Sequence, residues 1–126
     1  MKLKSFTAPD AVAVGPYSHA VESGGFVYLS GQTPINPKTG KLAEGGIGVQ
    51  TVQVFANLFA VLKAAGLSQD DVVKVNVFLT DMGNFKGMNE VYATQFSEPY
   101  PARSTIGVKE LPLGAMVEIE LIAKRP

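Results

Sequence analysis

Residues 49–65 constrain the fold most, because apolar side chains recur there at three- and four-residue intervals. The stripe consists of Val52, Phe55, Leu58, Phe59, Val61, Leu62 and Ala65. This spacing predicts an amphipathic helix, and Gly66 is typical of the residue just beyond a helix C-terminus. Because the stripe is wide, we expect this helix to pack on a sheet.

Two stretches with apolar residues at alternate positions predict strands of that sheet. Residues 72–80 place Val73, Val75, Val77 and Leu79 on one face. In residues 116–123, apolar residues alternate with Glu118 and Glu120, so the two glutamates lie on the face opposite to the apolar residues. Residues 85–96 form a second predicted helix after a turn that ends at Asn84. Its apolar stripe consists of Phe85, Met88, Tyr92 and Phe96, with Val91 beside it.

The N-terminal third predicts strands over residues 2–6, 17–21 and 26–32, with an irregular segment at 7–15. Gly24-Gly25 indicates a hairpin turn. Residues 34–48 are rich in proline and glycine and predict a loop. Gly45-Gly46-Ile47-Gly48 precedes the helix without matching a phosphate-binding pattern, so we interpret it as a flexible helix entry.

Leaving out the short stretch at residues 2–6, the order β-β-α-β-α-β-β over residues 1–126 predicts one α+β domain, with both helices on one face of a mixed sheet. Phe26, Tyr28, Phe78 and Ile122 would lie on the other face, which is too apolar to stay open to solvent. We therefore expect this face to be covered by oligomerisation.

Composition excludes several classes of site. The chain has no cysteine and one histidine, His19, so disulfides, thiolate nucleophiles and cysteine-ligated metals are excluded, and we expect no metal. We interpret His19 as a hydrogen-bonded strand residue. The 11 basic and 11 acidic side chains balance without charged runs, so we expect neither nucleic acid nor a membrane as partner. No apolar segment looks long enough to span a bilayer, and a soluble cytoplasmic protein is expected.

Arg103 follows Pro99 and Pro101 and opens a β-branched run, which predicts a strand over residues 102–108. A guanidinium held at the start of a strand suits a carboxylate ligand, because its planar fork donates two parallel hydrogen bonds. On the local sequence alone, the favoured interpretation is a surface or interface arginine that pairs with a structural carboxylate.

Glu118 and Glu120 share one face of the last predicted strand. We expect that strand to pair antiparallel with the Arg103 strand, since a short loop joins them. A structural Arg–Glu bridge and a site in which arginine holds an anion and glutamate handles water both remain open. Tyr17, Ser30 and Gly31 lie at predicted turns or strand ends, and Asn89 lies on the second helix; turn chemistry or surface exposure also explains them.

The ordered motifs resemble those of the Rid (YjgF-type) family over essentially the whole chain. They are Gly15-Pro16-Tyr17-Ser18, Ser30-Gly31-Gln32 with Pro34 and Asn36-Pro37-Lys38-Thr39-Gly40, Pro101-Ala102-Arg103-Ser104, and Val117-Glu118-Ile119-Glu120. Pro-Ala-Arg-Ser and the later glutamate are most similar to the RidA branch. The resemblance implies a chorismate mutase-like fold, a homotrimer with clefts between subunits, and a small carboxylate-bearing substrate.

The resemblance also implies cofactor-free hydrolysis of reactive enamines and imines, such as 2-aminoacrylate and 2-aminocrotonate, to 2-keto acids and ammonia. Arg103 would grip the substrate carboxylate, and Glu118 would hold or activate water. Tyr17, Ser30, Gly31, Asn89 and Thr105 would line the cleft. Thr105 stands where the family often has cysteine, which excludes regulation through a thiol there.

Two other functions stay open. The same cleft could bind a keto acid or amino acid without turnover, because a shared fold does not fix an activity. An RNA-cleaving inhibitor of translation is disfavoured, because RNA binding normally needs a basic surface.

Overall fold

A six-stranded sheet forms the frame of the protein. The computed structural model describes residues 3–9 and 15–126, so Lys2 of the first predicted strand and residues 10–14 of the predicted irregular segment lie outside it. The strand order is β1-β2-β3-β8-β6-β7, and neighbours are antiparallel except the parallel pair β6 and β7. These strands are β1 (Lys4–Phe6), β2 (Ala20–Ser23), β3 (Phe26–Gln32), β6 (Val72–Leu79), β7 (Ala102–Gly107) and β8 (Val117–Lys124).

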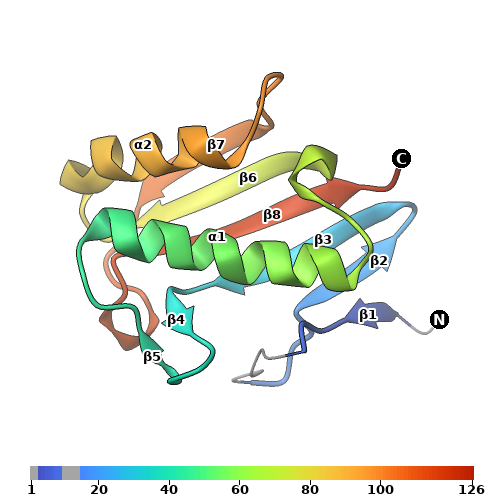
Figure 1. Ribbon diagram of the computed structural model, residues 1–126, viewed down its shortest axis with the longest axis horizontal. Helices are drawn as coiled ribbons and strands as arrows, with labels where there is room; N and C mark the ends of the chain where they lie inside the picture. The colour runs from blue at the N-terminus through green and yellow to red at the C-terminus, as the bar shows by residue number, and fades with distance from the viewer. Residues whose placement is uncertain (1–2, 10–14) are drawn as a thin grey trace.

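Two helices, α1 (Ile47–Ala64) and α2 (Phe85–Gln95), lie side by side over one face of the sheet (Figure 1). This confirms the predicted α+β architecture. Between the layers lie fully buried side chains from both, among them Phe55, Leu58, Leu62, Val75, Val77, Leu79, Ile119 and Leu121. Truncating one large side chain here to alanine would cost about 2–5 kcal/mol, because the packed neighbours cannot fill the space.

The buried face of α1 is rotated from the predicted stripe. Val52 is 52% exposed, whereas Gln50 and Thr51 are buried. The Thr51 hydroxyl donates to the carbonyl oxygen of Ile47 at 2.7 Å, and Gln50 Oε1 accepts from the amide of Met116 at 2.9 Å. Because these polar atoms are hydrogen-bonded, both side chains can be buried, and the Gln50 bond links α1 to the residue before β8. Gly66 has φ +76° just beyond the helix, as predicted.

α2 buries its predicted stripe. Met88, Tyr92 and Phe96 are buried, and Phe85 packs against the core. Asn84 is the cap of α2, but its side chain makes no capping hydrogen bond; instead Asp81 caps the short 3₁₀ turn before it, through the amide of Gly83 at 2.8 Å.

A bulge changes the start of β6. The register against β8 shifts between Val72 and Lys74, so Val72 is buried and Val73 is 42% exposed. The prediction that Val73 shares the buried row is therefore wrong, because a bulge moves the residues before it to the opposite face. Val75, Val77 and Leu79 do form that row.

The prediction that the Arg103 strand pairs with the last strand is also wrong. β7 pairs in parallel with β6 at the edge of the sheet, and β6 separates it from β8. The crossover from β6 to β7 runs through α2, and such β-α-β connections join parallel strands. The loop between β7 and β8 therefore crosses over the end of β6.

The sheet face opposite the helices is partly apolar, as predicted. Phe26 and Tyr28 on β3 are 36% and 42% exposed, and Phe78 and Ile122 on the neighbouring strands are partly buried. Lys124 lies over the Phe26 ring at 5.5 Å. We call this surface the open face. Its exposed aromatic side chains are unfavourable in contact with water.

The N-terminal third differs in detail. Residues 17–19 precede β2, which begins only at Ala20, and the predicted loop contains the small hairpin of β4 (Ile35–Asn36) and β5 (Lys41–Leu42). Gly24 and Gly25 have φ of +61° and +83°, as the predicted hairpin turn requires.

By length and composition alone, α1 could cross a membrane, contrary to the sequence expectation. One face of it is buried against the sheet, and the core helix of a soluble protein has the same composition.

Candidate active site

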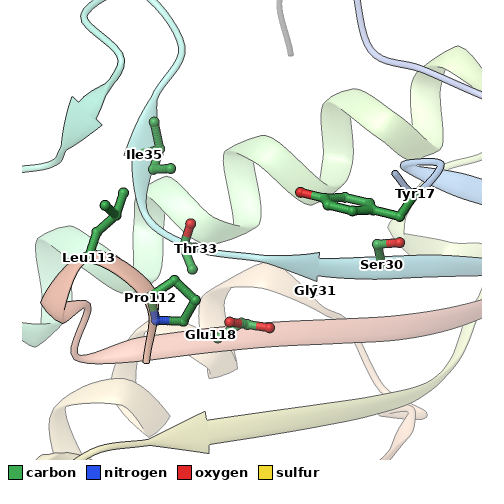
Figure 2. Close-up of a pocket in the computed structure, with 8 residues that line it drawn as sticks. All are labelled: Tyr17, Ser30, Gly31, Thr33, Ile35, Pro112, Leu113 and Glu118. Carbon is green, nitrogen blue, oxygen red and sulfur yellow. The ribbon is translucent and has the colours of Figure 1, made fainter. Parts of the chain in front are cut away.

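A cavity of about 490 Å³ opens beside β3 and the first residues of β8 (Figure 2). It is lined by Tyr17, Ser30, Gly31, Thr33, Ile35, Pro112, Leu113 and Glu118. Four of these residues, Tyr17, Ser30, Gly31 and Glu118, were predicted to belong to the site, and the structure brings them together. We call this the glutamate cavity.

A bulge in β3 shapes the floor of the glutamate cavity. Leu29 pairs with Leu121 and Gln32 with Ile119, so Ser30 and Gly31 together face one residue of β8. A methyl group on Gly31 would overlap the Glu118 carboxylate and lie 3.1 Å from its Cδ. Glycine at this position therefore lets the carboxylate lie against the β3 backbone.

Glu118 has a raised pKa. Burial is the larger cause, and the charge of Glu120 adds to it, because both disfavour the ionised form. Glu120 Oε2 accepts a hydrogen bond from the side-chain amide of Asn76 at 3.1 Å. Glu118 makes no ion pair with any described residue. A carboxyl group in this environment can carry a proton nearer neutral pH and exchange it with a ligand.

Ser30 fixes the segment that carries Tyr17. Its hydroxyl donates to the carbonyl oxygen of Ser18 at 2.6 Å, and its amide donates to the carbonyl oxygen of His19 at 2.9 Å. Tyr17 remains 47% exposed at the cavity, with its ring 6.5 Å from that of His19. The main interaction of the Ser30 hydroxyl is thus with its own chain.

His19 is buried, but its Nδ1 has no hydrogen-bond partner among the described residues. His19 also precedes β2, which begins at Ala20, so its predicted place in a strand is wrong, and its Nδ1 is not satisfied by the described residues. The described residues also contain no cluster of three side chains able to hold a metal ion.

Arg103 belongs to a second group of side chains, which lies under α2. Its Nη1 donates to Asn89 Oδ1 at 2.7 Å, and its guanidinium lies 4.5 Å from the centre of the Tyr92 ring. In the described part of the chain the only ion pair joins Arg125 to Glu22, so Arg103 has no carboxylate partner there. The predicted alternative of a structural Arg–Glu bridge within the chain is therefore wrong.

Thr105 lies two residues beyond Arg103 on the same side of β7, opposite Val77 of β6. Its hydroxyl is buried without a hydrogen-bond partner among the described residues. We call Arg103, Asn89 and Thr105 the arginine group.

The arginine group and the glutamate cavity occupy opposite sides of the sheet. Arg103 pairs with Val75, whose side chain faces the helices, whereas Glu118 pairs with Phe78, whose side chain lies on the open face. Paired residues in a sheet point to the same side, and β6 separates the two strands. Arg103 and Glu118 of one chain therefore cannot contact one ligand together.

Four residues of the glutamate cavity were missed by the sequence analysis: Thr33, Ile35, Pro112 and Leu113. Leu113 is 67% exposed and has φ +61°, a conformation that is costly for a side chain with a Cβ. The one feature of the sequence that could have placed Pro112 and Leu113 at the cavity is that Leu111-Pro112-Leu113-Gly114 closely precedes the strand that carries Glu118.

Known proteins resemble this chain along nearly its whole length. The family model described as Endoribonuclease L-PSP matches residues 7–125. A RutC family protein of Aquifex aeolicus is 51% identical over 124 residues, which cover 97% of each chain. A 2-iminobutanoate/2-iminopropanoate deaminase of Dermatophagoides farinae is 48% identical over 109 residues, covering 86% of this chain and 85% of the relative.

Solved structures share the fold. The crystal structure of RidA from the Antarctic bacterium Psychrobacter superposes with a TM-score of 0.91 at 48% identity, covering 96% of this chain and 98% of that one. The match of the family model to residues 7–125, the sequence identities and the common fold agree. The chain belongs to the YjgF/Rid family.

Proposed function

We propose that this protein hydrolyses reactive enamines and imines that carry a carboxylate, such as 2-aminoacrylate and 2-aminocrotonate, to 2-keto acids and ammonia. The proposal rests on two features: Arg103 has no carboxylate partner among the described residues, and Glu118, whose pKa is raised, lines a separate cavity. One group suits the substrate carboxylate and the other suits water and proton transfer. A relative at 48% identity is named for this reaction.

We further propose that the site is completed between subunits of a homotrimer. Because the two groups lie on opposite sides of the sheet, a head-to-tail contact can bring Arg103 of one subunit to the glutamate cavity of the next. A ring of three such contacts closes and contains three equivalent clefts. The open face, with Phe26 and Tyr28 exposed, supplies apolar surface for this assembly.

In the proposed reaction, the enamine first tautomerises to the imine, whose carbon is electrophilic. The water oxygen forms a bond to this carbon while the C=N π electrons move to nitrogen. Protonated Glu118 gives its proton to the nitrogen and takes one from the attacking water. Glu118 then protonates the amine, the C–N bond breaks as ammonia leaves, and the hydroxyl proton returns to Glu118 as the C=O bond forms.

The remaining residues support these steps. Asn89 holds one edge of the Arg103 guanidinium, and Ser30 holds the segment with Tyr17 at the cavity. Gly31 leaves space for the Glu118 carboxylate. Thr105 lies two residues from Arg103 on β7, and its hydroxyl, which bonds to none of the described residues, can turn to the ligand. Orientation of an electrophilic imine toward a positioned water needs no cofactor.

Arg103→Ala is the direct test. With 2-aminoacrylate generated in the assay, wild type is expected to accelerate keto-acid release, and Arg103→Ala to lose about 2–5 kcal/mol of transition-state stabilisation if the ion pair with substrate is desolvated. Arg125→Ala is the matched control, because Arg125 pairs with Glu22 and does not line the glutamate cavity.

If adding the wild-type protein does not change the rate of keto-acid release, the proposal is contradicted. Saturable binding of 2-ketobutyrate without acceleration would instead support a binding protein that uses the same cleft. RNA binding that weakens steeply with salt would point to the third function, which the balanced charge of the chain disfavours.

A further inference from the structure

The guanidinium of Arg103 is held by three side chains of one helix. Tyr92 and Phe85 of α2 lie with their ring centres 4.5 Å and 5.6 Å from its Cζ, and Asn89 accepts its Nη1–H at 2.7 Å. Asn89 and Tyr92 are three residues apart and so lie on the same side of the helix. Figure 1 shows that α2 runs beside β7, the strand that carries Arg103.

Of the two ring contacts, the one with Tyr92 is the closer, since Arg103 Cζ lies 4.5 Å from the Tyr92 ring centre and 5.6 Å from that of Phe85. A cation within about 6 Å of a ring centre is attracted to the face of the ring. A single hydrogen bond to Asn89 would leave the group free to turn about that bond. Attraction to the face of the Tyr92 ring restricts this turning and favours one direction for the remaining donors.

The hydroxyl of Tyr92 has no comparable role. It is buried and has no hydrogen-bond partner among the described residues, and burial raises the pKa of the phenol, so the ring is neutral. The ring itself is fixed by contacts with Phe55 and Phe96, whose centres lie 5.8 Å and 5.1 Å away. Tyr92 is thus a rigid aromatic surface between the core and Arg103.

We infer that Tyr92 is a positioning residue, which orients Arg103 for the carboxylate of the ligand through the face of its ring. This inference rests on the proposed role of Arg103 as carboxylate anchor. A guanidinium that is already ordered loses less conformational entropy on binding, so the ring strengthens binding without contacting the ligand.

Successive fluorination of the ring tests this inference. In the full-length protein, Tyr92 is replaced by phenylalanine and by phenylalanines with one, two or three ring fluorines, which weaken the negative ring face with little change of shape. The dissociation constant of 2-ketobutyrate is measured by calorimetry and KM in the deamination assay. Phenylalanine should retain most of the affinity, and the fluorinated rings should weaken binding progressively, by about two- to tenfold in total.

The same series at Phe96 is the matched control, because that ring touches Tyr92 in the core and is not among those that contact Arg103. Affinity should not change with fluorination there. Nuclear magnetic resonance of the ligand-free protein gives an independent readout. The guanidinium protons of Arg103 should show a ring-current shift that persists in Tyr92→Phe and becomes much smaller in Tyr92→Leu, where only the more distant Phe85 ring remains.

The outcomes separate the two proposals. If 2-ketobutyrate binds in an Arg103-dependent manner but affinity does not follow fluorination at position 92, Tyr92 does not position Arg103 and the proposed function stands. An absent ring-current shift also overturns the inference. If wild type and Arg103→Ala bind the probe equally, Arg103 is not the anchor and both proposals fail.

Discussion

Mixing two inactive variants tests whether Arg103 and Glu118 act across a subunit boundary. Arg103→Ala removes the proposed anchor, and Glu118→Gln removes the proton-transferring group while keeping the size of the side chain. Each variant alone should be inactive in the deamination assay. Because Arg103 and Glu118 lie on opposite sides of one sheet, two neighbouring subunits, one of each variant, can supply one intact Arg103–Glu118 pair between them.

The expected recovery of activity follows from the geometry of the proposed ring. If the two variants are unfolded and refolded together in equal amounts, a cleft is intact when its arginine comes from a Glu118→Gln subunit and its glutamate from an Arg103→Ala subunit. These two choices are independent, so about one quarter of the clefts should be intact. Keto-acid release should therefore recover to about one quarter of the wild-type rate at equal total protein.

A second mixture gives the matched control. Wild type refolded with an equal amount of the double variant should also show about one quarter of the full rate if each cleft needs two subunits, but about one half if each chain carries a complete site. Mass spectrometry of the intact assemblies checks that subunits have mixed. No recovery in the first mixture, together with one half in the second, would refute the assignment of the site to two subunits.

Two further predictions concern the glutamate cavity. Gly31→Ala should lower kcat with the fold retained, because the new methyl group displaces the Glu118 carboxylate. It should also lower the free energy of unfolding by about 1–3 kcal/mol. The control in both the activity assay and thermal melts is Gly46→Ala, whose added methyl group meets no atom within 4 Å. Glu118→Gln should stabilise the protein at pH 7, because the raised pKa of Glu118 means that ionisation is disfavoured in the folded state. The difference in unfolding free energy should vanish as the pH falls below the ordinary glutamate value of 4.5, where the carboxyl is protonated in both states, and a pH-independent difference in denaturant melts would contradict the cause given.

Regular spacing made much of the fold predictable. The stripe of α2 and the buried row of β8 were predicted correctly, because their apolar residues follow the periods of helix and strand without interruption. Val52 and Val73 were placed wrongly for local reasons. Hydrogen bonds allow Gln50 and Thr51 to be buried in α1, and a bulge reverses the alternation at the start of β6.

Strand partners were harder to predict than strands. The short loop before β8 suggested a hairpin with β7, but α2 had already brought β7 alongside β6 in parallel. This one difference separates Arg103 from Glu118. The sequence motifs thus predicted four of the residues that line the glutamate cavity, Tyr17, Ser30, Gly31 and Glu118. The separation of the cavity from Arg103 depends on pairing between distant strands, which local patterns do not encode.

The bulge at Ser30 and Gly31 limits how the chain can change in length. Because two residues of β3 there face one of β8, Gln32 returns to the helix side opposite Ile119, while Ser30 and Gly31 line the cavity. Loss of one residue between Leu29 and Gln32 would restore an even register and remove the place where Glu118 lies against the backbone. Insertions and deletions in this stretch should therefore be selected against in related proteins, even where substitutions are accepted.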